Sequence, residues 1–333
     1  MTPSPVGPRP VLVCGAGGFI GGHLAARLLA EGHRVRCADV KPLRSWFQLH
    51  PGAENLSLDL SHREQAAAAV AGVRDVYNLA ADMGGIGYIS THRADCMLSV
   101  LINTHLLLAA RESGVRRYFY ASSACVYPDY RQDRTEAQPL AEAMAYPAMP
   151  EDGYGWEKLF SERMCADFAA DYGLAVRVAR FHNVYGPHGS WDDGREKAPA
   201  ALCRKVARAV RSGGGEIELW GDGRRTRSFT YVDDCVEGVR RLMESGHDGP
   251  LNLGSSELVT VRELADLVCA TAGVRLRYRH DLTAPTGVAG RNSDNALVRS
   301  VLGWEPSVPL SAGLAATYPW IADRVGRAEE AAA

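Results

Sequence analysis

The chain has 333 residues, 46% of them hydrophobic, with 37 basic and 39 acidic side chains and a formal net charge of -2. This length can bury the core of one large or two moderate domains. The near balance of charge gives no reason to expect nucleic acid or a membrane surface as a partner. No apolar run reaches the ~18 residues of a membrane-spanning helix, and residues 1–10 lack the apolar stretch of a secretion signal. We therefore expect a cytoplasmic protein.

The eight cysteines are scattered along the chain without a CxxC pair. Disulfides and a structural metal site are therefore not expected. Cys14 and Cys37 fall in apolar runs, where we expect them to pack as small apolar residues.

The stretch VLVCGAGGFIGGHLAARLLAEGHRVRCADV, residues 11–40, has the pattern of a dinucleotide-binding unit. An apolar strand leads into a glycine-rich turn, and a helical pattern of leucines follows. The glycines of the turn are Gly15, Gly17, Gly18 and Gly21. Such glycines permit a tight turn, a close approach of backbone N–H groups to a pyrophosphate and close helix packing, with the phosphates at the helix N-terminus.

An acidic residue follows the next predicted strand. The strand Arg34 to Cys37 delivers Asp39 about 20 residues past the glycines. A carboxylate there accepts hydrogen bonds from the ribose hydroxyls of adenosine, which favours NAD. The extra phosphate of NADP would be repelled by Asp39. NADP stays open as an alternative cofactor, because the basic side chains of Lys41 and Arg44 are nearby.

Strands and helices then alternate. Expected strands cover 55–60, 75–80 and 117–122, and expected helices cover 63–71 and 98–112. This series predicts a parallel sheet with crossover helices, whose ligands collect beyond the carboxyl ends of the strands. The cofactor-binding residues expected there and at the glycine turn are Gly15, Gly18, Phe19, Ile20, Gly21, Asp39, Asp59, Leu60, Ala80 and Ala81.

The segment MGGIG, residues 83–87, comes directly after one of these strand ends. It is too rich in glycine for a helix interior, so we expect a loop at the ligand face. Two interpretations stay open: a flexible connector, or a backbone that approaches a sugar closely.

Tyr154 and Lys158 share one face of a predicted helix. A phenol has a pKa of about 10, so its use as a base near neutrality needs a shift of ~3 units, or ~4 kcal/mol. An adjacent ammonium and a positively charged nicotinamide would supply that shift. A bare YxxxK is common by chance. Its position after the nucleotide unit and the strand end Ser122 to Cys125 makes it strong evidence of a catalytic pair that also contacts the cofactor.

At this point the chain resembles the extended short-chain dehydrogenase/reductase superfamily of nucleotide-sugar enzymes. The segments NLAADMGGIGYI, YASSACVYP, RFHNVYGPHGSW, GREKAPAALCRK, RSFTYVDDCVEGV and GRNSDN closely resemble GDP-mannose 3,5-epimerases and extend from about residue 10 to 320. The resemblance implies a tightly bound NAD that is regenerated in each cycle and a nucleotide-sugar substrate, GDP-mannose. It also implies a homodimer in which the helices 98–112 and 154–171 pair.

The resemblance further implies five catalytic residues. Tyr154 would remove the proton of the 4-hydroxyl as hydride passes from C4 to NAD, with Lys158 holding the phenolate and a ribose hydroxyl. Ser123 would bind the oxygen. The ketone at C4 acidifies the C–H bonds at C3 and C5, which are then inverted by a base, matched by Cys125, and an acid, matched by Lys197.

The substrate-binding residues that the resemblance implies are Gly84, Gly85, Ser123, Asn183, Lys197, Lys205, Arg227 and Arg291. Arg227 and Arg291 match positions that bind the diphosphate, which suits bidentate guanidinium contacts. The chain departs from the plant members at two points. Arg225 stands where they usually have glutamine, and Ala289 stands at the first position of their Arg-Gly-Arg. The identity of the base and of the sugar is therefore left open.

The expected fold class is α/β, a Rossmann-type doubly wound parallel sheet with a smaller mixed α/β substrate-binding domain. We place the NAD-binding domain at 10–185, with returning segments at about 225–260. The substrate-binding domain is placed at 186–224 and 261–325. Residues 1–9 and 327–333 are expected to be disordered.

Three other functions stay open. A UDP-sugar 4-epimerase would use Tyr154, Lys158 and NAD without needing Cys125 or Lys197. A 4,6-dehydratase usually has an Asp-Glu pair where this chain has Ala124-Cys125. A catalytically silent nucleotide-binding scaffold is the third, and the complete catalytic set argues against it. Within the favoured function, inversion at C5 alone gives GDP-L-gulose, and inversion at both C3 and C5 gives GDP-L-galactose.

Overall fold

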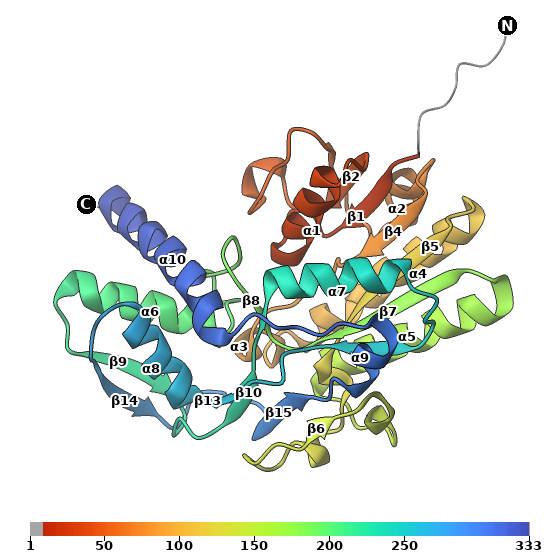
Figure 1. Ribbon diagram of the computed structural model, residues 1–333. Coiled ribbons are helices and arrows are strands. Elements are labelled where there is room, and N and C mark those ends of the chain that lie inside the picture. The colour runs from red at the N-terminus through yellow and green to blue at the C-terminus, as the bar shows by residue number, and fades with distance from the viewer. Residues whose placement is uncertain (1–8, 333) are drawn as a thin grey trace, which may run out of the picture.

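The computed structural model describes residues 9–332 and contains a seven-stranded parallel sheet in the order β12-β7-β5-β4-β1-β2-β3 (Figure 1). The strand order reverses beside β1, because β2 and β3 lie on one side of it and β4 on the other. The strands are β1 (Val11–Cys14), β2 (Val35–Asp39), β3 (Glu54–Ser57), β4 (Asp75–Asn78), β5 (Arg117–Ser123), β7 (Ala175–Phe181) and β12 (Pro250–Leu253).

Helices cover both faces of this sheet. Side chains alternate along β1, so that Val11 and Val13 pack into one apolar layer and Leu12 and Cys14 into the other. The first layer contains α1 (Phe19–Ala30), α7 (Val232–Glu244) and α9 (Ala296–Leu302), and the second contains α2 (Arg63–Val70), α4 (Arg93–Glu112) and α5 (Asp152–Tyr172). The predicted doubly wound α/β fold is confirmed.

A second apolar core lies outside the main sheet and its helices, in a part of the molecule that we call the other lobe. It is formed by α6 (Ala198–Ser212), α8 (Val261–Thr271) and α10 (Leu310–Ala332) (Figure 1). These helices pack with a parallel strand pair, β9 (Glu216–Trp220) and β14 (Arg277–Asp281). A four-stranded sheet contains β13 (Leu258–Thr260), β10 (Thr226–Ser228), β15 (Gly290–Ser293) and β6 (Pro139–Leu140). The remaining strands, β8 (Val184–Tyr185) and β11 (Thr230–Tyr231), form a pair, and a short helix α3 (Ile86–Ile89) follows β4.

The small sheet departs from the expected segment plan. β10 and β13 fall within 225–260, the range expected to return to the NAD-binding domain, yet they pair in the small sheet. In that range, β12 joins the main sheet and α7 covers it. The small sheet also contains β6, a short strand from the first half of the chain.

The ends of the described chain are more ordered than expected. Residues 327–332 continue α10, where Arg211 pairs with Glu329 at 2.7 Å. Arg9 donates to the carbonyl oxygen of Val73 at 2.5 Å. Residues 1–8 and 333, also expected to be disordered, lie outside the described residues. None of the helices in the described part of the chain is both long and apolar enough to cross a membrane.

The turn after β1 depends on Gly21, because a Cβ placed there would lie 2.1 Å from the carbonyl oxygen of Gly15. We expect Gly21→Ala to push α1 away from the turn and to lower the free energy of unfolding by about 1–3 kcal/mol. Urea denaturation measures this loss. Gly246→Ala is the control, since a Cβ there meets nothing within 4 Å. Equal losses in the two variants would contradict the packing argument.

Candidate active site

The glycine turn and the ends of β1 and β2 form a site that suits NAD. Gly18 is the N-cap residue of α1, and the first turn of this helix has no acidic side chain to repel a phosphate. Within 4 Å, a Cβ on Gly18 would meet only the carbonyl oxygen of Gly15, so the backbone is open to a pyrophosphate. Asp39 ends β2 and accepts the N–H of Lys41 through Oδ1 at 3.0 Å. Its Oδ2 is left for ribose hydroxyls.

The other residues predicted to bind the cofactor lie along the same edge of the sheet. Phe19 and Ile20 begin α1, and Ala80 and Ala81 follow β4. Asp59 and Leu60 follow β3, which ends earlier than predicted, at Ser57. Asp59 Oδ1 accepts from the hydroxyl and N–H of Ser61, and the hydroxyl bond in particular holds the pKa of Asp59 below its usual range.

A cavity of about 380 Å³ lies beyond the carboxyl ends of β4, β5 and β7. It brings together residues from both halves of the chain. The predicted residues that line it are Gly84, Gly85, Ser123, Cys125, Tyr154, Asn183, Lys197, Lys205, Arg227 and Arg291. Lys158 does not line the cavity but is buried beside Tyr154, with its Nζ 5.5 Å from the tyrosine ring centroid.

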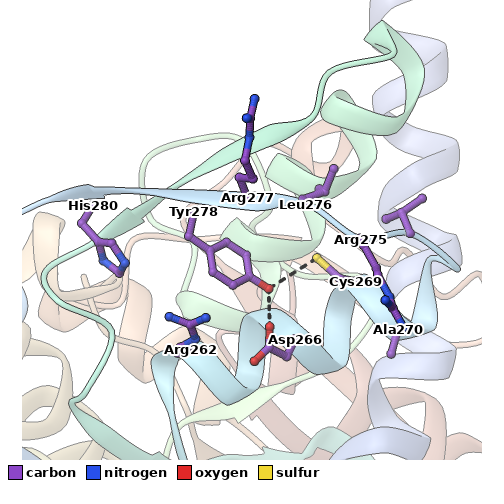
Figure 2. Close-up of a pocket in the computed structure, with 10 residues that line it drawn as sticks. Arg262, Asp266, Cys269, Ala270, Arg275, Leu276, Arg277, Tyr278 and His280 are labelled. Atoms are coloured by element: carbon purple, nitrogen blue, oxygen red, sulfur yellow. Dashed lines mark hydrogen bonds between the residues drawn. The ribbon is translucent and has the colours of Figure 1, made fainter.

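A second hollow, about 720 Å³, lies between α8 and β14 (Figure 2). It shares no lining residue with the first cavity and contains none of the predicted site residues. Figure 2 shows Tyr278 pointing across it to Asp266, to which it donates at 2.6 Å. Arg262, Arg275 and Arg277 at its rim are exposed, as in a solvated face. The predicted chemistry therefore belongs to the first cavity.

Tyr154 lies in the first turn of α5 and is almost fully buried. Burial raises the pKa of Tyr154 well above its usual value, because the phenolate would lose its hydration, and an interaction with the Ser123 hydroxyl lowers it. Ser123 also accepts the N–H of Cys125 at 3.2 Å. One hydroxyl thus contacts both the phenol and the segment that carries the thiol.

The Cys125 thiol lies against a buried ion pair. Arg291 donates to Cys125 Sγ at 3.5 Å and to Glu151 Oε2 at 2.7 Å, and its Nε donates to Gln132 at 2.5 Å. Burial, and then Glu151, raise the pKa of the thiol, while Arg291 lowers it. Glu151 is not among the site residues expected from the sequence. Arg291, expected at the diphosphate, contacts the thiol in this structure.

Lys197 is the N-cap residue of α6 and lines the cavity together with Cys125. Its Nζ donates no hydrogen bond to any residue within 9–332. Burial lowers the pKa of Lys197, and the nearby Cys125 raises it. An ammonium with a lowered pKa gives up its proton more readily, which suits a general acid.

The remaining predicted substrate residues are held by backbone groups. Asn183 has a φ of 41° and donates to the carbonyl oxygen of Ser228 at 3.0 Å. Arg227 donates to carbonyl oxygens of the loop before β15, and burial lowers its pKa to about 9. Lys205 donates to the carbonyl oxygen of Glu218 at 3.0 Å. All three side chains are oriented within the cavity wall by these contacts.

Two walls of the cavity are joined by three side chains that we call the Asp82 cluster: Asp82, Tyr88 and Arg195. Arg195 donates to Asp82 at 2.5 Å and to the Tyr88 hydroxyl at 2.6 Å, and its Cζ lies 3.9 Å from the Tyr88 ring centroid. Beside the cluster, Gly85 N–H donates to the Arg195 carbonyl oxygen at 2.9 Å. A Cβ on Gly85 would lie 2.5 Å from the carbonyl oxygen of Glu196, so this approach requires glycine.

The sequence profile of the NAD dependent epimerase/dehydratase family matches residues 11–254. The chain belongs to this family. It is 44% identical over 316 residues to the GDP-mannose 3,5-epimerase of Arabidopsis thaliana, covering 95% of this chain and 82% of that protein. The cofactor of this family is NAD, in agreement with the fit of the glycine turn and Asp39.

Solved structures support the family fold. The crystal structure of the UDP-glucose 4-epimerase of Thermotoga maritima with UDP-glucose matches this structure with a TM-score of 0.83 and a sequence identity of 25%. The match covers 95% of this chain and 99% of the epimerase chain. MoeE5 in complex with UDP-glucuronic acid and NAD has a TM-score of 0.79 at 28% identity, with the same coverage. The family fold thus extends over nearly the whole chain.

The Asp82 cluster predicts a measurable protection of one amide. In Asp82→Asn the ion pair with Arg195 is lost, and we expect hydrogen exchange at Gly85 N–H to rise about two- to fivefold, because half-exposed pairs contribute little. The control is Glu54→Gln, which breaks the pair with Arg36 and should leave Gly85 unchanged. Unchanged exchange in Asp82→Asn would show that the cluster does not hold this contact.

Proposed function

We propose that this chain epimerises a nucleotide sugar, GDP-D-mannose, at C3, at C5 or at both, through a 4-keto intermediate. The observation that carries the proposal is the presence of Cys125 and Lys197 in one cavity with Tyr154. A simple 4-epimerase needs only the tyrosine and its lysine. Identity of 44% to the GDP-mannose 3,5-epimerases of Arabidopsis and rice supports the choice of substrate.

The first step is an oxidation at C4. The glycine turn at Gly18 and the Asp39 carboxylate would hold NAD, which would supply the hydride acceptor for C4 and the hydride donor at the end of the cycle. Tyr154, as the phenolate, takes the proton of the 4-hydroxyl, and the Ser123 hydroxyl holds the sugar oxygen. The ammonium of Lys158 favours the phenolate electrostatically. The product of this step is a ketone at C4.

The ketone makes proton removal at C3 and C5 feasible, because the carbanion is delocalised onto the C4 oxygen. The Cys125 thiolate, stabilised by Arg291, takes the proton from one face of the ring. The Lys197 ammonium returns a proton to the opposite face, which inverts the carbon. This leaves a neutral thiol and a neutral amine, so each inversion is followed by a proton exchange that restores both groups.

The other predicted substrate residues keep the roles implied by the family resemblance. Gly84 and Gly85 offer backbone to the sugar, and Asn183 positions it. Arg227 and Arg291 supply positive charge for the diphosphate, Arg291 in addition to its contact with the Cys125 thiol, and Lys205 lines the same cavity as a further substrate-binding residue. Arg225 also lines the cavity and donates to the carbonyl oxygen of Gly287 at 2.6 Å, which adds a cation where the plant enzymes usually have glutamine.

Proton NMR of the NAD-loaded protein with GDP-mannose in D2O tests this function. We expect deuterium at C5, or at C3 and C5, together with inversion at the labelled carbons. Inversion at C4 without deuterium at C3 or C5 would instead indicate a 4-epimerase. Absence of turnover with every nucleotide sugar would indicate the silent scaffold.

Single substitutions should separate the two stages of the reaction. Tyr154→Phe should abolish turnover, because no ketone forms. Cys125→Ala and Lys197→Ala should retain hydride transfer but lower the inversion rate about 10²- to 10⁴-fold, as expected when a general base or acid is lost. Cys269→Ala, which removes a buried thiol of the other lobe, is the control. Full inversion in Cys125→Ala or Lys197→Ala would remove that residue from the mechanism.

We infer that the protein is a cytoplasmic homodimer formed through α4 and α5. Large apolar side chains on these helices are exposed, namely Met97, Leu98, Leu101, Trp156 and Phe160. Exposed apolar patches of this kind are typical of interfaces. A dimer that pairs the same two helices from each chain would bury them in a four-helix bundle.

Light scattering at micromolar concentration should give twice the chain mass of 36.0 kDa. Replacing Leu98 and Phe160 together by arginine should give the monomer mass, because two charges would be buried at the interface. A monomer mass for the unaltered chain would contradict the dimer. A dimer that survives the double substitution would place the interface elsewhere.

A further inference from the structure

Lys158, the partner of Tyr154, is itself paired with a buried carboxylate. Its Nζ lies 3.3 Å from Glu157 Oε2 and donates to the Tyr120 hydroxyl at 3.1 Å. Glu157 Oε1 accepts from Tyr120 at 3.0 Å and from Ser161 at 2.9 Å. Both charged side chains are at most 3% exposed. Glu157 Oε2 accepts no hydrogen bond within the described chain, so the lysine ammonium is the cation that faces it.

Besides these two charges on its own helix, Tyr154 is surrounded by groups from several other elements. Cys96 comes from α4, Cys125 from the turn after β5, and Ser123 from the end of β5. Tyr88 packs at the edge of the same cluster from α3. Cys125 is the one of these groups that the proposed reaction uses as an anion, and its thiolate would raise the pKa of Tyr154. Glu151, Lys197 and Arg291 are charged side chains that line the same cavity around that thiol. Lys158 and Glu157 add the two opposite charges on the helix of Tyr154 itself.

Glu157 and Lys158 follow Tyr154 by three and four residues on α5, so both lie on its side of the helix, and their opposite charges have opposite effects on the phenolate. The ammonium of Lys158 stabilises it, and the carboxylate of Glu157 destabilises it and raises the pKa of Tyr154. Tyr120 links the two groups as a neutral hydroxyl, because burial raises its own pKa well above the usual value. The carboxylate thus partly cancels the charge of the catalytic lysine.

We propose that Glu157 is a positioning residue that holds Lys158 and offsets its charge, so that Tyr154 both takes the proton of the sugar oxygen and gives it back. The role in the cycle rests on the proposed function. In that reaction hydride leaves C4 as the proton moves from O4 to Tyr154, and both return to the same atoms. A phenolate that Lys158 stabilises too strongly is a weak base and takes the proton of O4 slowly. Glu157 offsets that charge and keeps the phenolate basic enough for this step.

The ionisation of Tyr154 is measurable without any sugar. In NAD-loaded protein labelled with fluorotyrosine, fluorine NMR follows each tyrosine with pH, and Tyr154→Phe assigns the signal. We expect Glu157→Gln to lower the pKa of Tyr154 by about one to two pH units, the size expected for a nearby charge in a protein interior. An unchanged or higher pKa in this variant would overturn the proposal.

A double-mutant cycle separates charge from structure. Lys158→Met leaves the carboxylate unopposed and should raise the pKa of Tyr154. The double variant Glu157→Gln with Lys158→Met removes both charges, leaves no unpaired buried ion, and should return the pKa close to that of the unaltered protein. If the double variant matches Lys158→Met alone, Glu157 has no electrostatic effect on Tyr154 and the proposal fails.

Glu162→Gln is the matched control. Glu162 is a buried carboxylate on the same helix, paired with Arg180 at 2.7 Å and about two turns from Tyr154. Its loss should reduce stability without moving the pKa of Tyr154. Glu157→Asp keeps the charge and should keep the pKa close to its original value. An equal fall in Glu157→Asp and Glu157→Gln would indicate a structural effect and overturn the proposal.

Turnover gives a second readout. With GDP-mannose, Glu157→Gln should lower the fraction of reduced cofactor at steady state, seen by absorbance, because a less basic phenolate takes the proton of the 4-hydroxyl less readily as hydride leaves C4. A fraction equal to that of the unaltered protein would contradict the role in the cycle. If neither the unaltered protein nor any variant turns over the sugar, the proposed function fails. The titration of Tyr154 would still decide whether Glu157 offsets the charge of Lys158.

Discussion

The buried ion pair between Arg291 and Glu151 is the interaction on which the site depends. It joins β15, near the end of the chain, to the start of α5, and the same guanidinium contacts the Cys125 thiol at the end of β5. A buried pair of this kind stabilises little by itself, since both ions lose their hydration. Its value lies in geometry: removing either partner would leave a charge uncompensated beside the thiol.

Three basic side chains in the cavity or next to it are held apart by the fold. Lys158, buried beside the cavity, faces Glu157, and Arg291 faces Glu151. Lys197 lies near the thiol and forms no ion pair with a carboxylate within residues 9–332. The three basic groups therefore meet different local fields although they share one site. Such separation is what a reaction needs when one step stabilises an oxyanion, another stabilises a thiolate and a third donates a proton.

The local features of the fold could be predicted because their causes are local. The glycine turn, Asp39 and the Tyr154–Lys158 spacing depend on residues close in sequence. By contrast, β7 was not predicted, because Arg177 and Arg180 interrupt its apolar pattern. Arg180 is buried all the same, since Glu162 of α5 pairs with it. The pairing partner lies on another element, so the pattern of the strand alone does not reveal it.

The same reason explains the acidic residues that were missed at the site. Glu151 and Glu157 read as ordinary solvated carboxylates in a sequence, and only their burial against Arg291 and Lys158 gives them a role. The roles of Cys125 and Lys197 came from family resemblance and not from spacing. What the structure adds is that both residues line one cavity with Tyr154.

The small sheet has a consequence for the order in which the protein matures. β6, at residues 139–140, pairs with β15, at residues 290–293, and β12 completes the edge of the main sheet only after residue 250. Pairings between such distant segments form late, because the intervening chain must first be closed into a loop. During synthesis the glycine turn and its neighbouring strands are complete while β6 still lacks its partner. A nascent chain can therefore acquire its nucleotide site long before it can carry out chemistry on a sugar.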